Sequence, residues 1–390
     1  MNDADTFHAV VADYGGRLDT TNLHPPLAEG LNYAAQRARG FLQSAAALPE
    51  MPPIYFDFID NWEFNAKAFR QDGRYFIGIY RGAIATLGVL FDRMLADPQV
   101  LPFIGDAKEE AADLPLLPDI GLDFRRSVAS VPTFPRPRHW ARELTARKLV
   151  ELALDFLTAH EFAHIANGHL DYIVDHHGIG AIDEVSRAAW TSETTESALI
   201  SQTMEMDADA TAVLISLGSE WSKVAGSFPR PGQPWTEFYD YPGRVSLLWS
   251  WAVSSLFRLL GEARLTVGDV TQESYPRPRL RSVMIQQAAG RVLRPQGLHT
   301  KSPLIGDELH HIPMTIKAGQ VDAEKMFTQL TGKPEATEGF DEAWGDVGKS
   351  QMYRLQDYWQ TKLKGELLRF AQQPLSSYGD FGEEVTGKGS

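Results

Sequence analysis

The amino-acid sequence predicts an α+β fold that is mainly helical, with a small antiparallel sheet beside one long buried helix. The sheet is predicted by aromatic and β-branched runs on either side of Asp72-Gly73, a pattern typical of a β-hairpin. The long helix is predicted from about Ala141 to Ala166, where Asn167-Gly168 can end it. Shorter helices are expected over 27–48, 83–95, 193–217, 245–260, 282–293, 322–330 and 348–370.

The composition limits both the class of protein and the kind of site it can build. At 390 residues with 43% apolar content, the chain can bury a sizeable core. Asp and Glu number 51 against 37 Lys and Arg, and the net charge of -14 opposes binding to nucleic acid or to an anionic membrane. The chain has no cysteine, which excludes disulfides and thiolate ligands. Any metal ion must therefore be held by histidine and carboxylate side chains.

No segment reads as a signal peptide or a membrane span. The first residues lack the basic and apolar regions of a secretory signal, so export by that route is not expected. The most apolar long segment, Val245 to Leu260, contains Arg258 and is shorter than the about 20 residues that a bilayer span needs. We expect a core helix there, with an interfacial role for its tryptophans as the alternative. The expected location is the cytoplasm.

The strongest functional signal is an H-E-x-x-H motif, His160-Glu161-Phe162-Ala163-His164, within the long predicted helix. Residues four apart on a helix point the same way from successive turns, so the two imidazoles can bind one metal ion. Glu161 lies about 100° further round, where it can act on a water molecule but is not placed as the third ligand. Apolar residues surround the motif, which favours a buried helix over a solvated helix with two chance histidines.

The third metal ligand is expected on the next long helix. A catalytic zinc ion takes three protein ligands and leaves a fourth position for water. Glu205 and Asp209 are four residues apart and therefore share one helix face. Glu205 can complete the ligand set, and Asp209 can accept a hydrogen bond from the far nitrogen of a ligating histidine. Asp207 points to roughly the opposite face and is expected to be solvated.

Histidines that follow the motif fit less well. The alternative pattern H-E-x-x-H-x-x-G-x-x-H requires glycine and histidine where the chain has Asn167 and Leu170. On a continuing helix, His169 would point about 140° away from His164, so it is expected at the surface or as a capping residue. His176-His177 has no spacing argument behind it.

His160-Glu161-x-x-His164 followed by Glu205-x-x-Ala208-Asp209 resembles the gluzincin zinc metallopeptidases, in particular the group of the CaaX prenyl proteases and the membrane heat-shock protease HtpX. The resemblance covers about residues 60 to 285 and implies a zincin-like metallopeptidase fold. Those relatives are often membrane-embedded, and this chain lacks their spans. It therefore looks like a soluble relative, loosely similar to the Lit-type phage-exclusion peptidases.

Further segments are similar to that group. Asn65-Ala66-x-Ala68-Phe69 resembles the group's hairpin, whose second strand implies an edge onto which substrate adds as an extra strand, here at Phe76, Ile77 and Gly78. Gly168-His169 also recurs in the group. Tyr275-Pro276 with Arg281 is similar to a His-Pro-x4-Arg segment near the active site, with tyrosine in place of the histidine. The resemblance thus implies Tyr275 or Arg281 as a partner of the oxyanion.

The chain is therefore expected to be a zinc metalloendopeptidase, with one zinc ion per chain and a protein or peptide as substrate. Glu161 is the expected general base and acid, acting on water activated by the metal. One alternative is a metallopeptidase-fold sensor or regulatory protein that acts by binding a partner, which an intact Glu161 disfavours. Another is an interaction protein with a structural zinc site, although such sites are usually closed by four ligands, mostly cysteine. The sequence determines neither the substrate nor the oligomeric state.

The chain shows no internal repeat and no clean linker, so one catalytic domain with helical additions is expected. The expected parts are an N-terminal helical extension (1–53), the zincin-like catalytic domain (54–290), a C-terminal helical extension (291–375) and a disordered tail (376–390). The stretch 96–139, rich in proline and acidic residues, is the longest irregular segment. A lid or recognition loop and a disordered excursion are the two interpretations of it.

Overall fold

The computed structural model describes residues 2–23, 25–45, 51–111, 113–121, 124–125, 134–178, 180–183, 195–225, 242–261, 264–273, 275–292 and 312–375. It is 67% helical and 8% strand, which confirms the mainly helical α+β fold. The predicted tail at 376–390 lies outside the described residues, as does part of the irregular stretch 96–139.

Four strands form a single sheet in the order β1-β3-β2-β4. They are β1 (Ile54–Ile59), β2 (Ala66–Gln71), β3 (Arg74–Tyr80) and β4 (Ala181–Asp183). The predicted hairpin is confirmed: β2 and β3 pair antiparallel, and Asp72 and Gly73 turn the chain with φ of 51° and 74°. The prediction of an antiparallel sheet was wrong in one respect. After β1 the chain passes the end of β3 before it forms β2, so β1 pairs parallel to β3 and the sheet is mixed.

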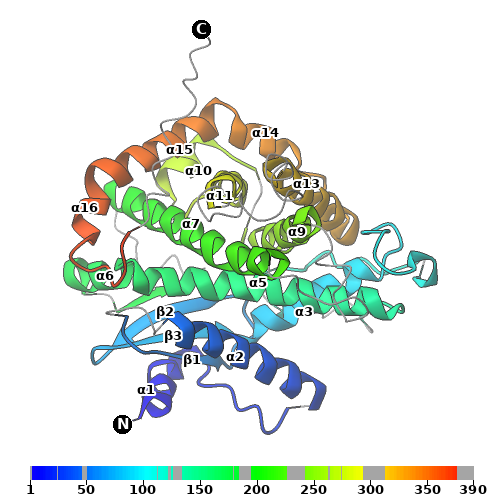
Figure 1. Cartoon of the computed structure of the whole chain (residues 1–390), viewed down its shortest axis with the longest axis horizontal. Helices are drawn as coiled ribbons and strands as arrows, with labels where there is room; N and C mark the ends of the chain where they lie inside the picture. The colour runs from blue at the N-terminus through cyan, green and yellow to red at the C-terminus, as the bar shows by residue number, and fades with distance from the viewer. Residues whose placement is uncertain are drawn as a thin grey trace.

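The helices form two groups separated by α5, as Figure 1 shows. The sheet, α1 and α2 lie on one side of α5, and most of the later helices lie on the other. The described helices are α1 (Asp3–Val10), η1 (Ala12–Tyr14), α2 (Pro25–Ala45), α3 (Arg81–Leu95), η2 (Ala107–Glu109), α5 (Trp140–Ala166), α6 (His169–His177), α7 (Thr195–Ala225), α9 (Pro242–Leu260), α10 (Val267–Gln272), α11 (Pro278–Val292), α13 (Ile312–Thr331), α14 (Glu338–Trp344), α15 (Asp346–Tyr358), η5 (Trp359–Leu363) and α16 (Lys364–Leu367).

Helix α5 is buried on nearly all sides because each of its faces has a partner. It packs against α7 and α9 in the helical layer, against α3, and against β2 and β3 of the sheet. An all-round apolar composition is what such a position requires. The main hydrophobic cluster extends from Leu31 on α2 to Leu367 on α16, so both predicted extensions share one core with the central part of the chain.

Residues 368–375, called the C-terminal segment below, pack over the end of α5. Helix α5 ends at Ala166, and Gly168 adopts φ of 80° to turn the chain into α6. The backbone amide of Gln372 donates to the carbonyl of Ala166, an acceptor that the helix end leaves unpaired. A side chain at position 168 would lie 2.6 Å from the backbone of Phe370. Residues 370–372 therefore pack directly on the turn that follows the H-E-x-x-H motif.

Among the described residues, no helix is both long and apolar enough to cross a membrane. The apolar segment near Val245 to Leu260 forms α9, which packs against α13, α5 and α11. Its tryptophans Trp249 and Trp251 are 0% and 1% exposed. The expectation of a core helix is confirmed, and the interfacial alternative was wrong for these two side chains.

The two glycines that flank α6 provide a test of this packing. Gly168 and Gly178 have similar left-handed conformations, but only at Gly168 would an added methyl group meet backbone; at Gly178 it meets nothing within 4 Å. Gly178→Ala should lower the free energy of unfolding by about 1 to 2 kcal/mol through backbone strain alone. Gly168→Ala should lower the free energy of unfolding by about 1 to 3 kcal/mol more than Gly178→Ala, because Phe370 must move. Urea unfolding of both variants measures the difference, and equal effects would show that the C-terminal segment does not pack there.

Candidate metal centre

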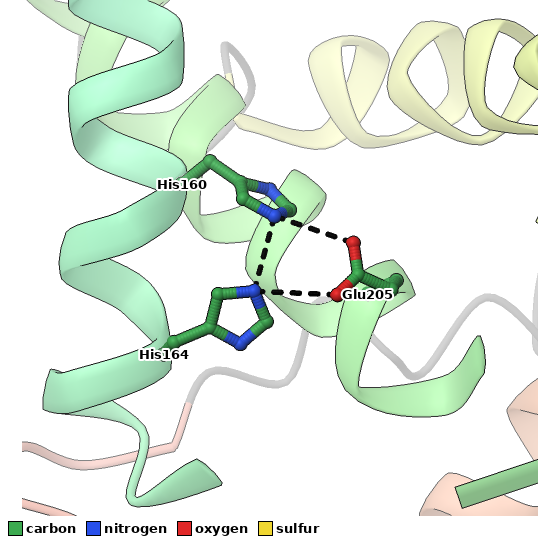
Figure 2. A group of neighbouring side chains, drawn as sticks. All are labelled: His160, His164 and Glu205. Atoms are coloured by element: carbon green, nitrogen blue, oxygen red, sulfur yellow. Dashed lines mark hydrogen bonds and ion pairs between the residues drawn. The ribbon is translucent and has the colours of Figure 1, made fainter. Parts of the chain in front are cut away.

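The candidate site lies where α5 and α7 pack against each other. His160 and His164 come from successive turns of α5, and Glu205 comes from the facing helix α7. The three side chains point toward one another, as Figure 2 shows. All are buried, with exposures of 0%, 1% and 2% respectively. The helix spacing and the burial read from the sequence are thus both present in the structure.

The ligand atoms of these residues converge. The Nε2 atoms of His160 and His164 are 3.1 Å apart. The Glu205 carboxylate lies 3.3 Å from Nε2 of His160 and 3.4 Å from Nε2 of His164. One ligand atom from each side chain falls within 4.8 Å of the others, so the group could hold one metal ion. Two imidazole nitrogens and a carboxylate oxygen are a common donor set for a divalent transition metal.

The protonation states favour metal binding over an internal ion pair. Burial lowers the pKa of His164 to about 4, although a hydrogen bond and the charge of Glu205 oppose this shift. Burial alone would raise the pKa of Glu205, but its contacts with His160 and His164 hold this pKa well below its usual range. Near neutral pH the site therefore combines an ionised carboxylate with a neutral His164 imidazole, and a neutral imidazole is the form that binds metal.

Asp209 fixes the direction in which His160 presents its lone pair. Its Oδ1 lies 3.0 Å from Nδ1 of His160. An ionised carboxylate can only accept, so Nδ1 carries the proton and Nε2 keeps its lone pair toward His164. Two nitrogen lone pairs and a carboxylate that face one another repel unless a cation lies among them. These residues therefore fit a bound metal ion, and Asp209 has the supporting position predicted for it.

Arg281 holds Asp209 rather than the reacting centre. From α11, its Nε and Nη2 donate to the two carboxylate oxygens of Asp209, each at 2.8 Å. Burial would raise the pKa of Asp209, but the charge of Arg281, together with hydrogen bonds from His160 and Arg281, lowers it. The guanidinium also lies 3.8 Å from Glu205 and stacks over the ring of Phe257. Side-chain contacts thus run from His160 to Asp209 and from Asp209 to Arg281, which makes Arg281 a positioning residue.

Two expectations for polar residues near the motif were wrong. His169 is 0% exposed, not at the surface, and its Nδ1 lies 3.0 Å from Nδ1 of His164. Asp207 is 2% exposed, not solvated, and its Oδ2 lies 3.1 Å from Nε2 of His169. The first error follows from assuming a helix that continues past the motif, and the second from assuming that the face of α7 opposite Glu205 is open to solvent. The left-handed turn at Gly168 instead brings His169 back beneath His164.

Glu161 is 1% exposed within α5. Its place next to His160 turns it about 100° from that ligand, consistent with a role beside the metal rather than on it. Tyr275 is half-buried in the short segment before α11. The hydrogen bonds of Arg281 to Asp209 place its guanidinium behind the ligands.

The predicted substrate edge was wrong. Phe76, Ile77 and Gly78 lie in β3, which is hydrogen-bonded to β1 on one side and to β2 on the other, so this strand offers no free edge. Gly78 is explained by packing: an added side chain would lie 2.7 Å from the Ile59 side chain. The outer position beside β2 is taken by β4.

A separate cavity of about 1140 Å³ follows another face of α5. It lies between α2, α3, α5 and β1, and its lining along α5 extends as far as Thr158. His160, His164 and Glu205 do not line it. The metal-binding residues are therefore enclosed by the α5–α7 interface and do not open into this cavity.

Comparison of the chain with protein-family models, with curated proteins and with solved structures gives no match.

Metal binding can be measured directly. The full-length protein should bind one divalent transition-metal ion per chain, detected by elemental analysis after dialysis. Glu205→Gln replaces an anionic ligand by a neutral one and should weaken binding by at least about tenfold. Glu196→Gln is the control, because Glu196 lies on the same helix but is exposed and pairs with Lys362. Equal metal content in both variants would place the third ligand elsewhere.

The support of Asp209 by Arg281 can be tested without metal. Arg281→Met leaves a buried carboxylate without its guanidinium partner and should lower the free energy of unfolding by about 3 to 5 kcal/mol. Arg277→Met breaks an ion pair with Glu273 that is partly solvated, and should cost about 1 kcal/mol or less. Urea unfolding of the two apoproteins gives both values. A cost for Arg281→Met no greater than that for Arg277→Met would contradict the proposed charge pairing.

Proposed function

We propose that the protein is a zinc-dependent metalloendopeptidase that hydrolyses peptide bonds of a protein or peptide substrate. The observation that carries the proposal is the convergence of His160, His164 and Glu205 within 4.8 Å, with Glu161 directly after the first ligand. Among the described residues, three ligands with a neighbouring carboxylate converge, which is the arrangement of catalytic zinc sites, whereas structural sites are closed by a fourth protein ligand.

Zinc is favoured over magnesium and calcium by the donor set. Two imidazoles and one carboxylate suit zinc, whereas magnesium and calcium prefer sites made of oxygen ligands. The chain has no cysteine, so thiolate ligation does not compete. When bound, a zinc ion supplies Lewis-acid activation of water and of the substrate carbonyl.

The protein's own residues have distinct roles in the proposed reaction. Glu161 accepts a proton from the attacking water at its carboxylate and then donates it to the leaving amine, so that one carboxyl group is both base and acid. Asp209 holds His160 in the tautomer that leaves Nε2 free to ligate. Arg281 keeps Asp209 ionised through two hydrogen bonds. The oxyanion role of Tyr275 stays a hypothesis, and the cytoplasm stays the expected location.

Enclosure of the site favours a second candidate function. Glu161 and the three metal-binding residues are at most 2% exposed, so a peptide requires an opening of the site before it can bind. The same enclosure suits a metal-dependent sensor or regulatory protein that acts through a partner. The two candidates differ in one result: a peptidase shows chelator-sensitive cleavage of peptides, and a sensor binds the metal without cleavage.

Glu161→Gln separates catalysis from metal binding. The substitution keeps the size of the side chain but removes the proton acceptor, so cleavage of a broad peptide library should fall by about 10²- to 10⁴-fold while zinc content is unchanged. Glu143→Gln is the matched control on the same helix, since Glu143 pairs with Arg147 near the surface and should leave cleavage intact.

A Glu161→Gln variant that cleaves at the wild-type rate would refute the assigned base. A wild-type protein that binds zinc but cleaves no peptide in the library, before or after limited proteolysis, would support the regulatory candidate instead.

A further inference from the structure

The two histidine ligands are supported by different means. His160 contacts a carboxylate directly, through Asp209. His164 contacts a second histidine, His169, which in turn contacts Asp207. These supporting side chains are all buried, and each bond joins side chains from different elements or turns. The second chain of contacts is the less usual one, because carboxylates or backbone carbonyls ordinarily orient a ligating imidazole.

The hydrogen-bond directions along the second chain are determined by its two ends. With Nε2 of His164 facing the ligand cluster as a lone pair, Nδ1 carries the proton and donates to Nδ1 of His169. Nε2 of His169 then carries its proton and donates to the carboxylate of Asp207, 3.1 Å away. Every ring nitrogen in this series of hydrogen bonds has one role, either donor or acceptor. A metal ion at Nε2 of His164 and an anion at Asp207 are therefore mutually consistent.

The contacts from His164 through His169 to Asp207 are called the relay below. Asn167 connects this relay to Gln373 in the C-terminal segment. Its Nδ2 donates to Oδ2 of Asp207 at 2.6 Å and to Thr211 at 2.9 Å. Its Oδ1 accepts a hydrogen bond of 2.8 Å from Nε2 of Gln373. The Asp207 carboxylate can only accept, so Asn167 turns its Nδ2 toward Asp207 and its Oδ1 toward Gln373, which donates to it. The backbone bond from Gln372 to Ala166 holds this segment in place.

We propose that His169 and Asp207 are positioning residues for the metal ligand His164, and that Gln373 of the C-terminal segment completes this support through Asn167. The inference rests on the metal site of the proposed function but is independent of peptide cleavage. The C-terminal segment, which packs on the turn after the motif, thereby has a role: the ligand set reaches full metal affinity only when this segment is docked.

The physical basis is the orientation and basicity of the His164 imidazole. A hydrogen bond accepted from Nδ1–H fixes the ring plane and the tautomer and increases electron density at Nε2. Loss of such a partner typically weakens metal binding by about 10- to 100-fold. Loss of Gln373 acts one bond further away and removes one net hydrogen bond, which corresponds to about fivefold in Kd.

Three substitutions at His169 distinguish the effect of losing the hydrogen-bond acceptor from the effect of losing the volume of the ring. His169→Asn retains an oxygen acceptor near the position of Nδ1, and should bind Zn²⁺ within about fivefold of wild type. His169→Gln places its amide near the position of Nε2 and can contact Asp207 but not His164. His169→Leu lacks both contacts. The Gln and Leu variants should each bind Zn²⁺ about 10- to 100-fold more weakly, measured by competition with a chelating dye.

Substitutions of two neighbouring glutamines test the contribution of the C-terminal segment. Gln373→Ala removes the donor to Asn167 and should weaken Zn²⁺ binding about fivefold. Gln372→Ala is the matched control, because its side chain contacts Asp171 and the carbonyl of Phe370 instead. It should leave the affinity unchanged. The visible absorption of the Co²⁺-substituted protein should change with Gln373→Ala and His169→Leu but not with Gln372→Ala, a difference that a general loss of stability would not produce.

The outcomes distinguish this inference from the proposed function. Equal Zn²⁺ affinity in wild type, His169→Asn, His169→Leu and Gln373→Ala would overturn the relay and leave the peptidase proposal intact. Rescue by asparagine but not by glutamine, in a protein that cleaves no peptide, would support the relay and count against the peptidase. If His169→Leu does not fold, the comparison of asparagine with glutamine decides. A wild type that binds no Zn²⁺ would overturn both proposals.

Discussion

The structure depends on the pairing of charged and polar side chains that α5 and α7 bury between them. The two helices run antiparallel, with Lys148 beside Glu220 at one end and His164 beside Glu205 at the other. A buried ion without a partner costs several kcal/mol, so each acidic residue on α7 requires a donor or a cation opposite it. The rest of the fold supplies these: Arg281 comes from α11, His169 from α6 and Asn167 from the end of α5.

The centre of the site could be predicted from the sequence because it depends on helix geometry alone. His160 and His164 are one turn apart on α5, and Glu205 and Asp209 are one turn apart on α7, so each pair lies on one helix face whatever the tertiary contacts are. Apolar residues around both pairs predicted burial. Two buried helices that each carry metal-binding groups on one face gain most when those faces meet.

The supporting residues could not be predicted in the same way, because they depend on a change of chain direction. His169 reaches His164 because Gly168 adopts a left-handed conformation, and Asp207 is buried where His169 and Asn167 contact it. Likewise the hairpin signal at Asp72-Gly73 is local and was read correctly, whereas the position of β1 on the far side of β3 depends on a crossing that no local pattern encodes. The lost substrate edge at Phe76 follows from that crossing.

The chain of contacts from Gln373 to His164 makes metal binding and C-terminal docking reciprocal. If docking raises the affinity for a metal ion, thermodynamic linkage requires that the bound ion strengthen docking by the same factor. The site lies in the middle of the sequence, but its last supporting donor comes from the described C-terminal end, more than two hundred residues further along. A chain that lacks this segment would hold the three ligands with less order. Metal affinity in this fold therefore also depends on whether the C-terminal segment is docked.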